Sequence, residues 1–387
     1  MNVVLPRRLQ ALPPYLFVEI DNQKRAALAR GVDVIDLGVG DPDLPTPKLI
    51  LDALQAASQD PRNHQYPLGR GRSDFLEAVS AWLFRRFGVK ADPKREVLCL
   101  IGSKEGIGHA PLAFVNPGDV VLIPDPGYPV YYASTVFAGA EPFRLPLLEQ
   151  NRFLPDLEAI PEDVARRAKL MFLNYPNNPT AATADREFLE RVVAWCRRHE
   201  VILAYDMAYS EIYFEGNPPS SILELPGASE VAIEFHSFSK TFSMTGWRLG
   251  FACGRRELVD ALAQLKGNLD SGTVSAVQMA GKAGLEHDQE IVPELVRVYR
   301  RRRDLFVAGL QTAGFKVQPP AATFYIWCRV PAGFDSTQYA TRLLEQAAVV
   351  ATPGVGFGPA GEGFIRFSLT SPDDRLQEAV KRIQTVA

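Results

Sequence analysis

The sequence predicts an α/β fold built on a doubly wound, largely parallel sheet. Apolar, β-branched runs alternate with segments of helical periodicity through most of the chain, which is the pattern of strands joined by crossover helices. The chain also has 387 residues, of which 47% are hydrophobic. That length and composition are sufficient for a large core and for more than one domain.

Individual elements follow from the same patterns. Runs with the composition of buried strands occupy residues 97–101, 120–124, 170–174, 201–206, 231–237 and 249–253. The segment 188–199 is typical of a helix, because Leu189, Val192 and Cys196 recur on one stripe. The sheet is therefore expected to be covered by helices of this kind.

The pattern changes near the C-terminus. From about Pro293 a long amphipathic helix is expected, followed by two short strands in TFYIWCRV and GFIRFSLT. Its four consecutive arginines, 300–303, could bind an anion, but at helical spacing they point in several directions, which favours a solvated face. We expect a large α/β domain over residues 36–290, and a small α+β domain from residues 1–35, with an N-terminal arm, and 291–387.

Composition excludes several classes of function. The 42 basic and 45 acidic side chains nearly balance, which gives no indication of a nucleic-acid or membrane partner. The four cysteines show no zinc-site or disulfide spacing, and neither a secretion signal nor an eighteen-residue apolar run is evident. We expect a cytoplasmic protein that binds small molecules and no metal.

The stretch HSFSKTFSMTGWRLG, residues 236–250, carries the most chemistry. It follows an expected strand, and open α/β sheets bind ligands at the carboxyl edge of their strands. Lys240 supplies an amine, and Ser237 and Ser239 supply hydroxyl groups. Arg248 offers a planar fork that can hold a phosphate through two hydrogen bonds. A lone lysine after a strand is usually just solvated, but these neighbours indicate a phosphate site around a reactive amine.

Three other segments place polar groups at strand ends. GSKEGI (102–107) opens a helix, whose free N–H groups can hold an anion. NYPNNPT (174–180) and YDMAYSE (205–211) each follow an expected strand. Taken alone, these segments also fit ordinary turns and helix caps.

The lysine segment resembles the cofactor-lysine signature of fold-type I, class I/II aminotransferases, and the resemblance covers nearly the whole chain. It implies a mostly parallel seven-stranded sheet between helices, a smaller α+β domain, and pyridoxal 5′-phosphate as the cofactor. In that family the residue matching Lys240 forms the Schiff base. The matches of Ser237, Ser239 and Arg248 bind the cofactor's phosphate.

The same resemblance assigns roles to the other segments. Asp206 would pair with the cofactor's pyridine nitrogen and keep the ring an electron sink. Asn178 and Tyr209 would donate hydrogen bonds to its ring oxygen. Further cofactor contacts are implied for Ser103, Lys104 and Tyr128, of which the first two would contact the phosphate and the third would stack on the ring.

Two residues are implied to complete the site. Tyr66 resembles the tyrosine that reaches the phosphate in the neighbouring subunit, which implies a homodimer with shared active sites. Arg366 lies in an apolar strand, where a buried guanidinium needs an anionic partner. That partner is either an Asp or Glu side chain or, as the resemblance implies, the α-carboxylate of the substrate.

Within the family the chain most resembles LL-diaminopimelate aminotransferases, through strings such as PPYLF, DLGVGDPDLPTP and KGNLDSG. This implies an amino transfer between LL-diaminopimelate and 2-oxoglutarate in lysine biosynthesis, with ping-pong kinetics. It also implies that the substrate pocket contains Tyr15, Gly40, Asn178, Arg366 and, from the partner subunit, Asn268.

The sequence departs from the family pattern at two positions, and these departures leave the identity of the substrate open. Ala181 stands where the family usually has glycine, and it would be strained at positive φ. Arg70 stands near the place of an acidic residue, and a cation there could favour an acidic substrate. Alternatives are therefore aspartate, N-succinyl-diaminopimelate or broad-range transamination, or C–S β-elimination with the same lysine. A sensor domain of a transcription regulator would need a basic recognition helix, which is absent before DLGVGD.

Overall fold

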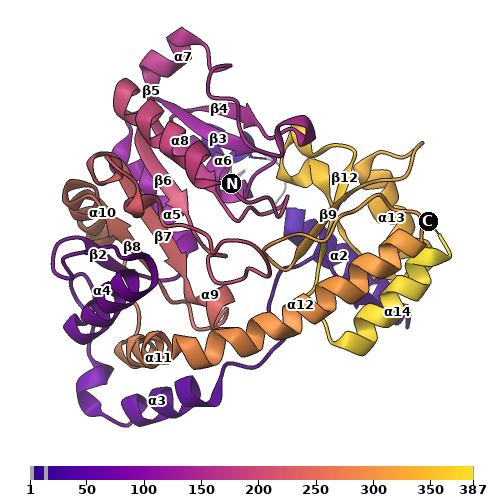
Figure 1. The fold of residues 1–387 in the computed structure, drawn as a ribbon, viewed down its shortest axis with the longest axis horizontal. Coiled ribbons are helices and arrows are strands. Elements are labelled where there is room, and N and C mark those ends of the chain that lie inside the picture. The colour runs from indigo at the N-terminus through magenta and orange to yellow at the C-terminus, as the bar shows by residue number, and fades with distance from the viewer. Residues whose placement is uncertain (1–3, 13–15, 387) are drawn as a thin grey trace.

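The computed structural model describes residues 4–12 and 16–386, and its larger part is organised around a seven-stranded sheet (Figure 1). In spatial order the strands are β2 (Val97–Leu100), β8 (Gly250–Gly254), β7 (Ala232–Ser237), β6 (Ile202–Asp206), β5 (Ala168–Asn174), β3 (Val120–Asp125) and β4 (Glu141–Pro146). Only β8 runs antiparallel to its neighbours. The expected mostly parallel sheet is confirmed.

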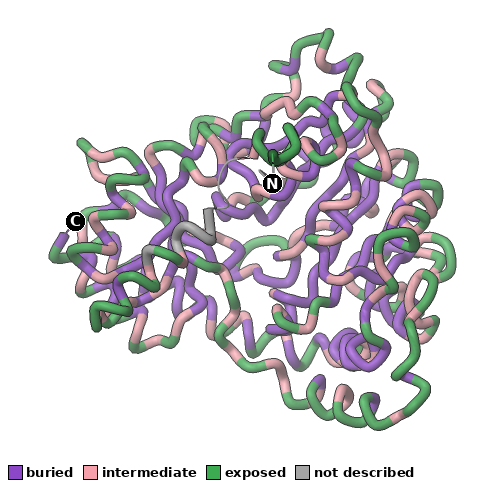
Figure 2. Tube along the Cα trace, turned by 180° about the vertical axis from the view of Figure 1, so that it is seen from behind, coloured by how far each residue is buried: buried purple, intermediate pink, exposed green. Residues whose placement is uncertain are grey.

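Helices cover both faces of this sheet. Along β3, Val120 and Leu122 join one hydrophobic core, and Val121 and Ile123 join the other. The first face carries α3 (Lys48–Ser58), α4 (Ser73–Phe87), α7 (Glu162–Arg167), α8 (Arg186–His199) and α11 (Ser275–Glu286). The second carries α5 (Ser103–Phe114), α6 (Pro129–Phe137) and α10 (Arg256–Leu269). The strands are consequently buried between two more exposed layers (Figure 2).

A separate core lies at the other end of the molecule (Figure 1). It contains an antiparallel sheet of β11 (Thr352–Pro353), β12 (Phe364–Ser368) and β9 (Tyr325–Arg329), and the pair β1 (Ile35–Asp36) and β10 (Val349–Val350). Besides α12, which is described next, the other α-helices of the described residues are α1 (Arg7–Gln10), α2 (Leu16–Ala29), α9 (Phe238–Thr241), α13 (Ser336–Ala347) and α14 (Asp373–Gln384).

One helix, α12 (Asp288–Thr312), connects the two parts. Its Leu295 packs in the first core, whereas Tyr299 and Phe306 pack in the other. The expected helix from Pro293 is therefore present and begins five residues earlier, at Asp288. The expected domain limits, 36–290 against 1–35 with 291–387, stay a prediction.

The solvated face expected for the arginines of α12 is wrong at two positions. Arg302 is 4% and Arg303 is 2% exposed. Arg302 forms an ion pair with Asp43, and Arg303 forms one with Glu215. A charge can be buried when it is paired in this way, and helical periodicity does not show which positions find partners.

None of the helices within residues 4–12 and 16–386 combines the length and the apolar character that a bilayer-spanning helix needs.

Candidate active site

A cavity of about 530 Å³ opens at the carboxyl ends of β5, β6 and β7. Most of the residues predicted from the sequence line it, although they come from segments far apart in the chain. These are Gly40, Ser103, Lys104, Tyr128, Asn178, Asp206, Tyr209, Ser237, Ser239, Lys240, Arg248 and Arg366. The structure therefore brings the predicted cofactor and substrate groups into one space.

Lys240 lies in α9, directly after β7. Its Nζ donates a hydrogen bond to the carbonyl oxygen of Gly40 at 2.7 Å. Burial lowers the pKa of Lys240 from 10.5 to about 8, an effect opposed by Asp41 and reinforced by Arg366 and Arg248. An amine with a pKa near 8 has a much larger neutral fraction at physiological pH than an ordinary lysine, and the neutral amine is the form that attacks a carbonyl carbon.

Asp206 ends β6 and is 5% exposed. Its Oδ2 accepts a hydrogen bond from the hydroxyl of Tyr131 at 2.8 Å, and its Oδ1 accepts one from the Ala208 N–H at 3.2 Å. Burial raises the pKa of Asp206 to about 6, although both hydrogen bonds oppose that shift. A buried carboxylate of this kind is suited to pairing with a cationic ring nitrogen.

Tyr131 was not predicted. In the sequence it resembles an ordinary core aromatic. In the structure its ring does pack in the core, stacked on Phe172 with ring centroids 4.9 Å apart.

Arg366 is held at the other side of the cavity by neutral acceptors. It is 1% exposed, and it donates to the Asn178 side-chain oxygen at 2.7 Å and to the Gly38 carbonyl at 2.5 Å. Its guanidinium carbon also lies 4.2 Å from the centre of the Tyr325 ring. Burial lowers the pKa of Arg366. These contacts orient the guanidinium at the wall of the cavity.

The phosphate end combines a helix N-terminus with a guanidinium. Gly102 precedes α5 with φ 76°, and a Cβ built there would lie 2.5 Å from Nη2 of Arg248. Glycine is therefore needed for Arg248 to approach the first turn of α5, which opens with Ser103. Anions bind at such N-termini, so the residues present fit the phosphate of pyridoxal phosphate.

Ser237 and Ser239 complete that end of the cavity. Ser237 is the N-cap of α9, and its Oγ accepts a hydrogen bond from the Ser239 N–H at 3.2 Å. Both serines are buried and line the cavity beside Lys240.

Three predicted residues lie elsewhere. Tyr66 is 77% exposed. Asn268 is exposed and donates to the Gln264 carbonyl in α10. Neither lines the cavity of its own chain, as the prediction of contributions from a partner subunit requires. Tyr15 lies outside the described residues.

The two departures from the family pattern have structural consequences. Arg70 forms an ion pair with Asp260 and donates to the Arg95 carbonyl, so its charge is already compensated within the chain. This pairing argues against Arg70 as a selector of acidic substrates. Ala181 does adopt positive φ, 59°, in the turn that presents Asn178. An alanine is strained there relative to glycine.

Sequence and structure comparisons agree with this geometry. Residues 32–383 match the family model for aminotransferase class I and II. An LL-diaminopimelate aminotransferase of Syntrophobacter fumaroxidans is 54% identical over the full length of both chains. A substrate-bound BacF structure from Bacillus subtilis superposes with a TM-score of 0.96 at 39% identity, covering 100% of this chain and 98% of that one.

A second solved structure is similar over nearly the same length. It is a probable N-succinyldiaminopimelate aminotransferase from Thermus thermophilus, with a TM-score of 0.91 and 41% identity, covering 96% of this chain and 100% of that one. The chain belongs to the class I and II aminotransferases, which are pyridoxal-phosphate-dependent enzymes.

Proposed function

We propose that this aminotransferase moves an amino group from LL-diaminopimelate to 2-oxoglutarate in lysine biosynthesis, in the cytoplasm. The reaction type rests on one observation, the convergence of Lys240, Asp206 and Arg366 on a single cavity. The choice of substrate is supported by the full-length relative named LL-diaminopimelate aminotransferase, which is 54% identical.

Each residue of the cavity has a defined task in this proposal. Pyridoxal phosphate, when bound, supplies an electron sink that acidifies the α-proton of the amino acid. Lys240 is neutral when the pH exceeds its pKa of about 8. It would take that proton as a general base and then return it as a general acid. Asp206 would compensate the positive charge of the ring nitrogen, and Tyr209 would donate a hydrogen bond to the ring oxygen.

Arg366 fixes the orientation of the substrate. A guanidinium can bind a carboxylate through two parallel hydrogen bonds, so the α-carboxylate would lie against Arg366 and its α-carbon toward Lys240. Such positioning lowers the entropic part of the barrier. Asn178 holds the guanidinium in place through the 2.7 Å hydrogen bond.

A substrate panel tests the proposal. LL-diaminopimelate, glutamate, aspartate and N-succinyl-diaminopimelate should be assayed as donors with several 2-oxo acids. We expect the highest kcat/KM for LL-diaminopimelate with 2-oxoglutarate, and parallel initial-rate lines, as a ping-pong exchange requires. A preference for the succinylated donor would replace the proposed substrate. Release of pyruvate and ammonia from a thioether amino acid without any oxo acid would indicate C–S β-elimination instead.

We propose further that the enzyme is a homodimer in which each subunit contributes to the other's site. Tyr66 and Leu68 are each 77% exposed, and Leu269 and Val274 are 56% and 58% exposed. The segment that carries Tyr66 and Leu68 adjoins the segment between Leu269 and Val274, because a Cβ at Gly272 would lie 2.8 Å from the Pro67 carbonyl oxygen. Exposed apolar residues gathered in this way favour a protein interface.

Mixed dimers test this assembly. Lys240→Ala and Tyr66→Ala should each be inactive or strongly impaired alone. Reassociating the two variants in equal amounts should restore roughly a quarter of the wild-type activity, because half of the dimers would then contain one complete site. No recovery on mixing, together with a monomeric mass in sedimentation analysis, would contradict the shared site.

A further inference from the structure

The cavity contains a buried tyrosine pair, of which only one member has a task in the proposed reaction. Tyr325 is 2% exposed, and its hydroxyl lies 2.9 Å from the hydroxyl of Tyr209. The two rings are inclined by 69° with centroids 5.5 Å apart. Burial, and next the neighbouring Tyr325, raise the pKa of Tyr209 well above its usual value. Tyr209 therefore stays a phenol, able to donate one hydrogen bond while it accepts another.

Tyr325 also supports the guanidinium of Arg366. In the antiparallel pair of β9 and β12, Tyr325 lies opposite Ser368 and Trp327 lies opposite Arg366. Tyr325 and Arg366 are thus diagonal neighbours on one face of the sheet. The guanidinium carbon lies 4.2 Å from the centre of the Tyr325 ring, which is within the range of a cation–π interaction.

The Tyr325 ring is closely packed against the backbone of Gly40. A Cβ added at Gly40 would overlap the Tyr325 hydroxyl and would lie 2.7 Å from its Cε1. The carbonyl of the same glycine accepts the hydrogen bond from Lys240. Gly40 therefore packs against Tyr325 and holds the lysine amine at the same time.

The backbone beside Tyr325 is strained and tied to the segment that carries Tyr209. Thr323 is fully buried with φ 66°, a costly conformation for a β-branched residue. Its Oγ1 accepts from the Tyr325 N–H at 3.1 Å, and its own N–H donates to the Ile212 carbonyl at 2.7 Å. Ile212 follows Tyr209 by three residues, so these bonds fix the two tyrosines relative to each other.

We propose that Tyr325 is a positioning residue that acts on both ends of the substrate site. Its hydroxyl donates to Tyr209 and strengthens the hydrogen bond that Tyr209 donates to the cofactor's ring oxygen. Its ring face holds the guanidinium of Arg366 in the orientation that receives the carboxylate. This inference rests on the proposed function, in which Tyr209 and Arg366 have those two roles.

Two substitutions separate the two contributions. Tyr325→Phe removes only the hydroxyl. Tyr209 then donates more weakly to the ring oxygen, and the nitrogen that joins Lys240 to the cofactor holds its proton more tightly. The pH midpoint of the holoenzyme's visible absorption should rise by about half a pH unit to one pH unit, with KM for the amino donor within about twofold of wild type. Tyr325→Leu also removes the ring and should raise that KM about tenfold.

Matched controls distinguish positioning from a general structural role. In a Tyr209→Phe background, Tyr325→Phe should cause no further movement of the midpoint, because the effect passes through Tyr209. Tyr339→Phe removes a hydroxyl from another buried tyrosine of the same core, which does not line the cavity, and it should leave the midpoint unchanged.

The outcomes are separable from those of the proposed function. A wild-type enzyme that binds the cofactor and transaminates, with a Tyr325→Phe variant of identical midpoint, would overturn only the role of Tyr325. If Tyr325→Phe still moves the pH midpoint by the full amount in the Tyr209→Phe background, the proposed role of Tyr325 would be overturned as well. Absence of a chromophore in the wild type would instead refute the proposed function. Should Tyr325→Leu fail to fold, the Tyr325→Phe titration still decides.

Discussion

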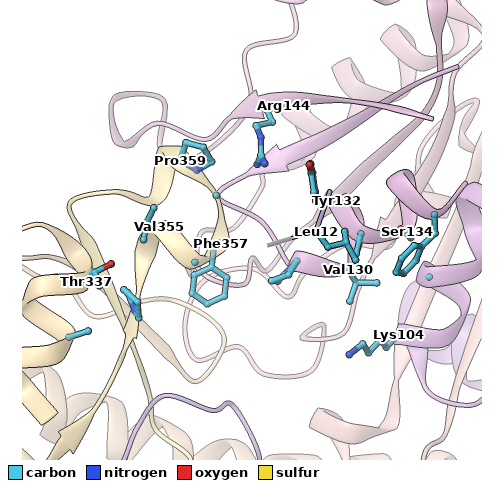
Figure 3. Close-up of a pocket in the computed structure, with 18 of the residues that line it drawn as sticks. Leu12, Lys104, Val130, Tyr132, Ser134, Arg144, Thr337, Val355, Phe357 and Pro359 are labelled. Atoms are coloured by element: carbon cyan, nitrogen blue, oxygen red, sulfur yellow. The ribbon is translucent and has the colours of Figure 1, made fainter. Parts of the chain in front are cut away.

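The two cavities between the larger and smaller parts of this molecule differ in size and in chemistry. The larger, about 1150 Å³, lies between α5, α6 and the segment 337–359. Figure 3 shows apolar side chains around it, among them Val130, Val355 and Phe357. The smaller, about 530 Å³, holds Lys240 and Asp206 with shifted pKa values. Volume alone would therefore select the larger cavity. Buried ionisable groups whose pKa values are shifted by that burial indicate instead that the smaller cavity is the reactive one.

The two cavities share part of their walls. Lys104 and Arg248 line both. Phe357 lines the larger cavity, and its ring centre lies 4.7 Å from the guanidinium carbon of Arg366 in the smaller one. Substitutions of side chains that line only one cavity therefore show which of the two serves the reaction.

The largest effect is expected at Lys240. Lys240→Ala removes both the covalent anchor and the general base, so kcat should fall about 10⁴-fold or more. Steady-state transamination measures this loss. Lys282→Ala is the control, because Lys282 forms an ion pair with Glu286 on α11, away from the cavity, and it should retain normal activity. Comparable losses in both variants would show that Lys240 has no special role.

Arg366→Ala should have the next largest effect. Losing two charge-assisted hydrogen bonds to the substrate carboxylate should lower kcat/KM about a hundredfold. Arg329 is the matched control in the same small sheet, since it is exposed and pairs with Glu149. Arg329→Ala should leave kcat/KM unchanged. A normal kcat/KM for Arg366→Ala would remove the substrate carboxylate from this side of the cavity.

A pH titration sharpens the contrast without any substitution. The pKa of Lys240 is lowered to about 8 by burial, so its neutral form gains population as the pH rises through 8. The rate at which cofactor-free protein captures pyridoxal phosphate, followed by absorbance, should therefore rise about tenfold between pH 7 and pH 9. A midpoint near 10.5, as for a solvated lysine, would show that burial does not tune this amine.

The smallest effect is expected in the larger cavity. Leu112 and Phe137 line it and are 43% and 40% exposed. Because neither residue lines the smaller cavity, Leu112→Ala and Phe137→Ala should each change kcat/KM by less than about twofold. A loss approaching that of Arg366→Ala would mean that the larger cavity belongs to the substrate site.

Much of this arrangement could be predicted from the sequence, for physical reasons. Strands buried on both faces give continuous apolar runs, so six of the seven strands of the large sheet were found. The seventh, β4, is an edge strand that is only partly buried and contains Pro142 and Pro146, and its pattern therefore resembles a loop. The lysine segment identified the phosphate end because its groups lie close together in the chain.

The missed residues share one cause. Tyr131 and Tyr325 lie within apolar segments and read as core aromatics, and their function depends on partners 75 and 116 residues away. The burial of Arg302 and Arg303 escapes prediction for the same reason, because their acidic partners lie in distant segments. Residue type and local spacing predict what a side chain can do, whereas tertiary contacts decide whether it is used.

The central claim is that Lys240 is the residue bonded to the cofactor in the smaller cavity. The most direct measurement is borohydride reduction of the yellow holoenzyme, followed by proteolysis and mass spectrometry of the labelled peptide. The account predicts one modified peptide, containing Lys240 from the segment HSFSKTF. A label found on another lysine, or a protein that forms no reducible chromophore, would contradict it.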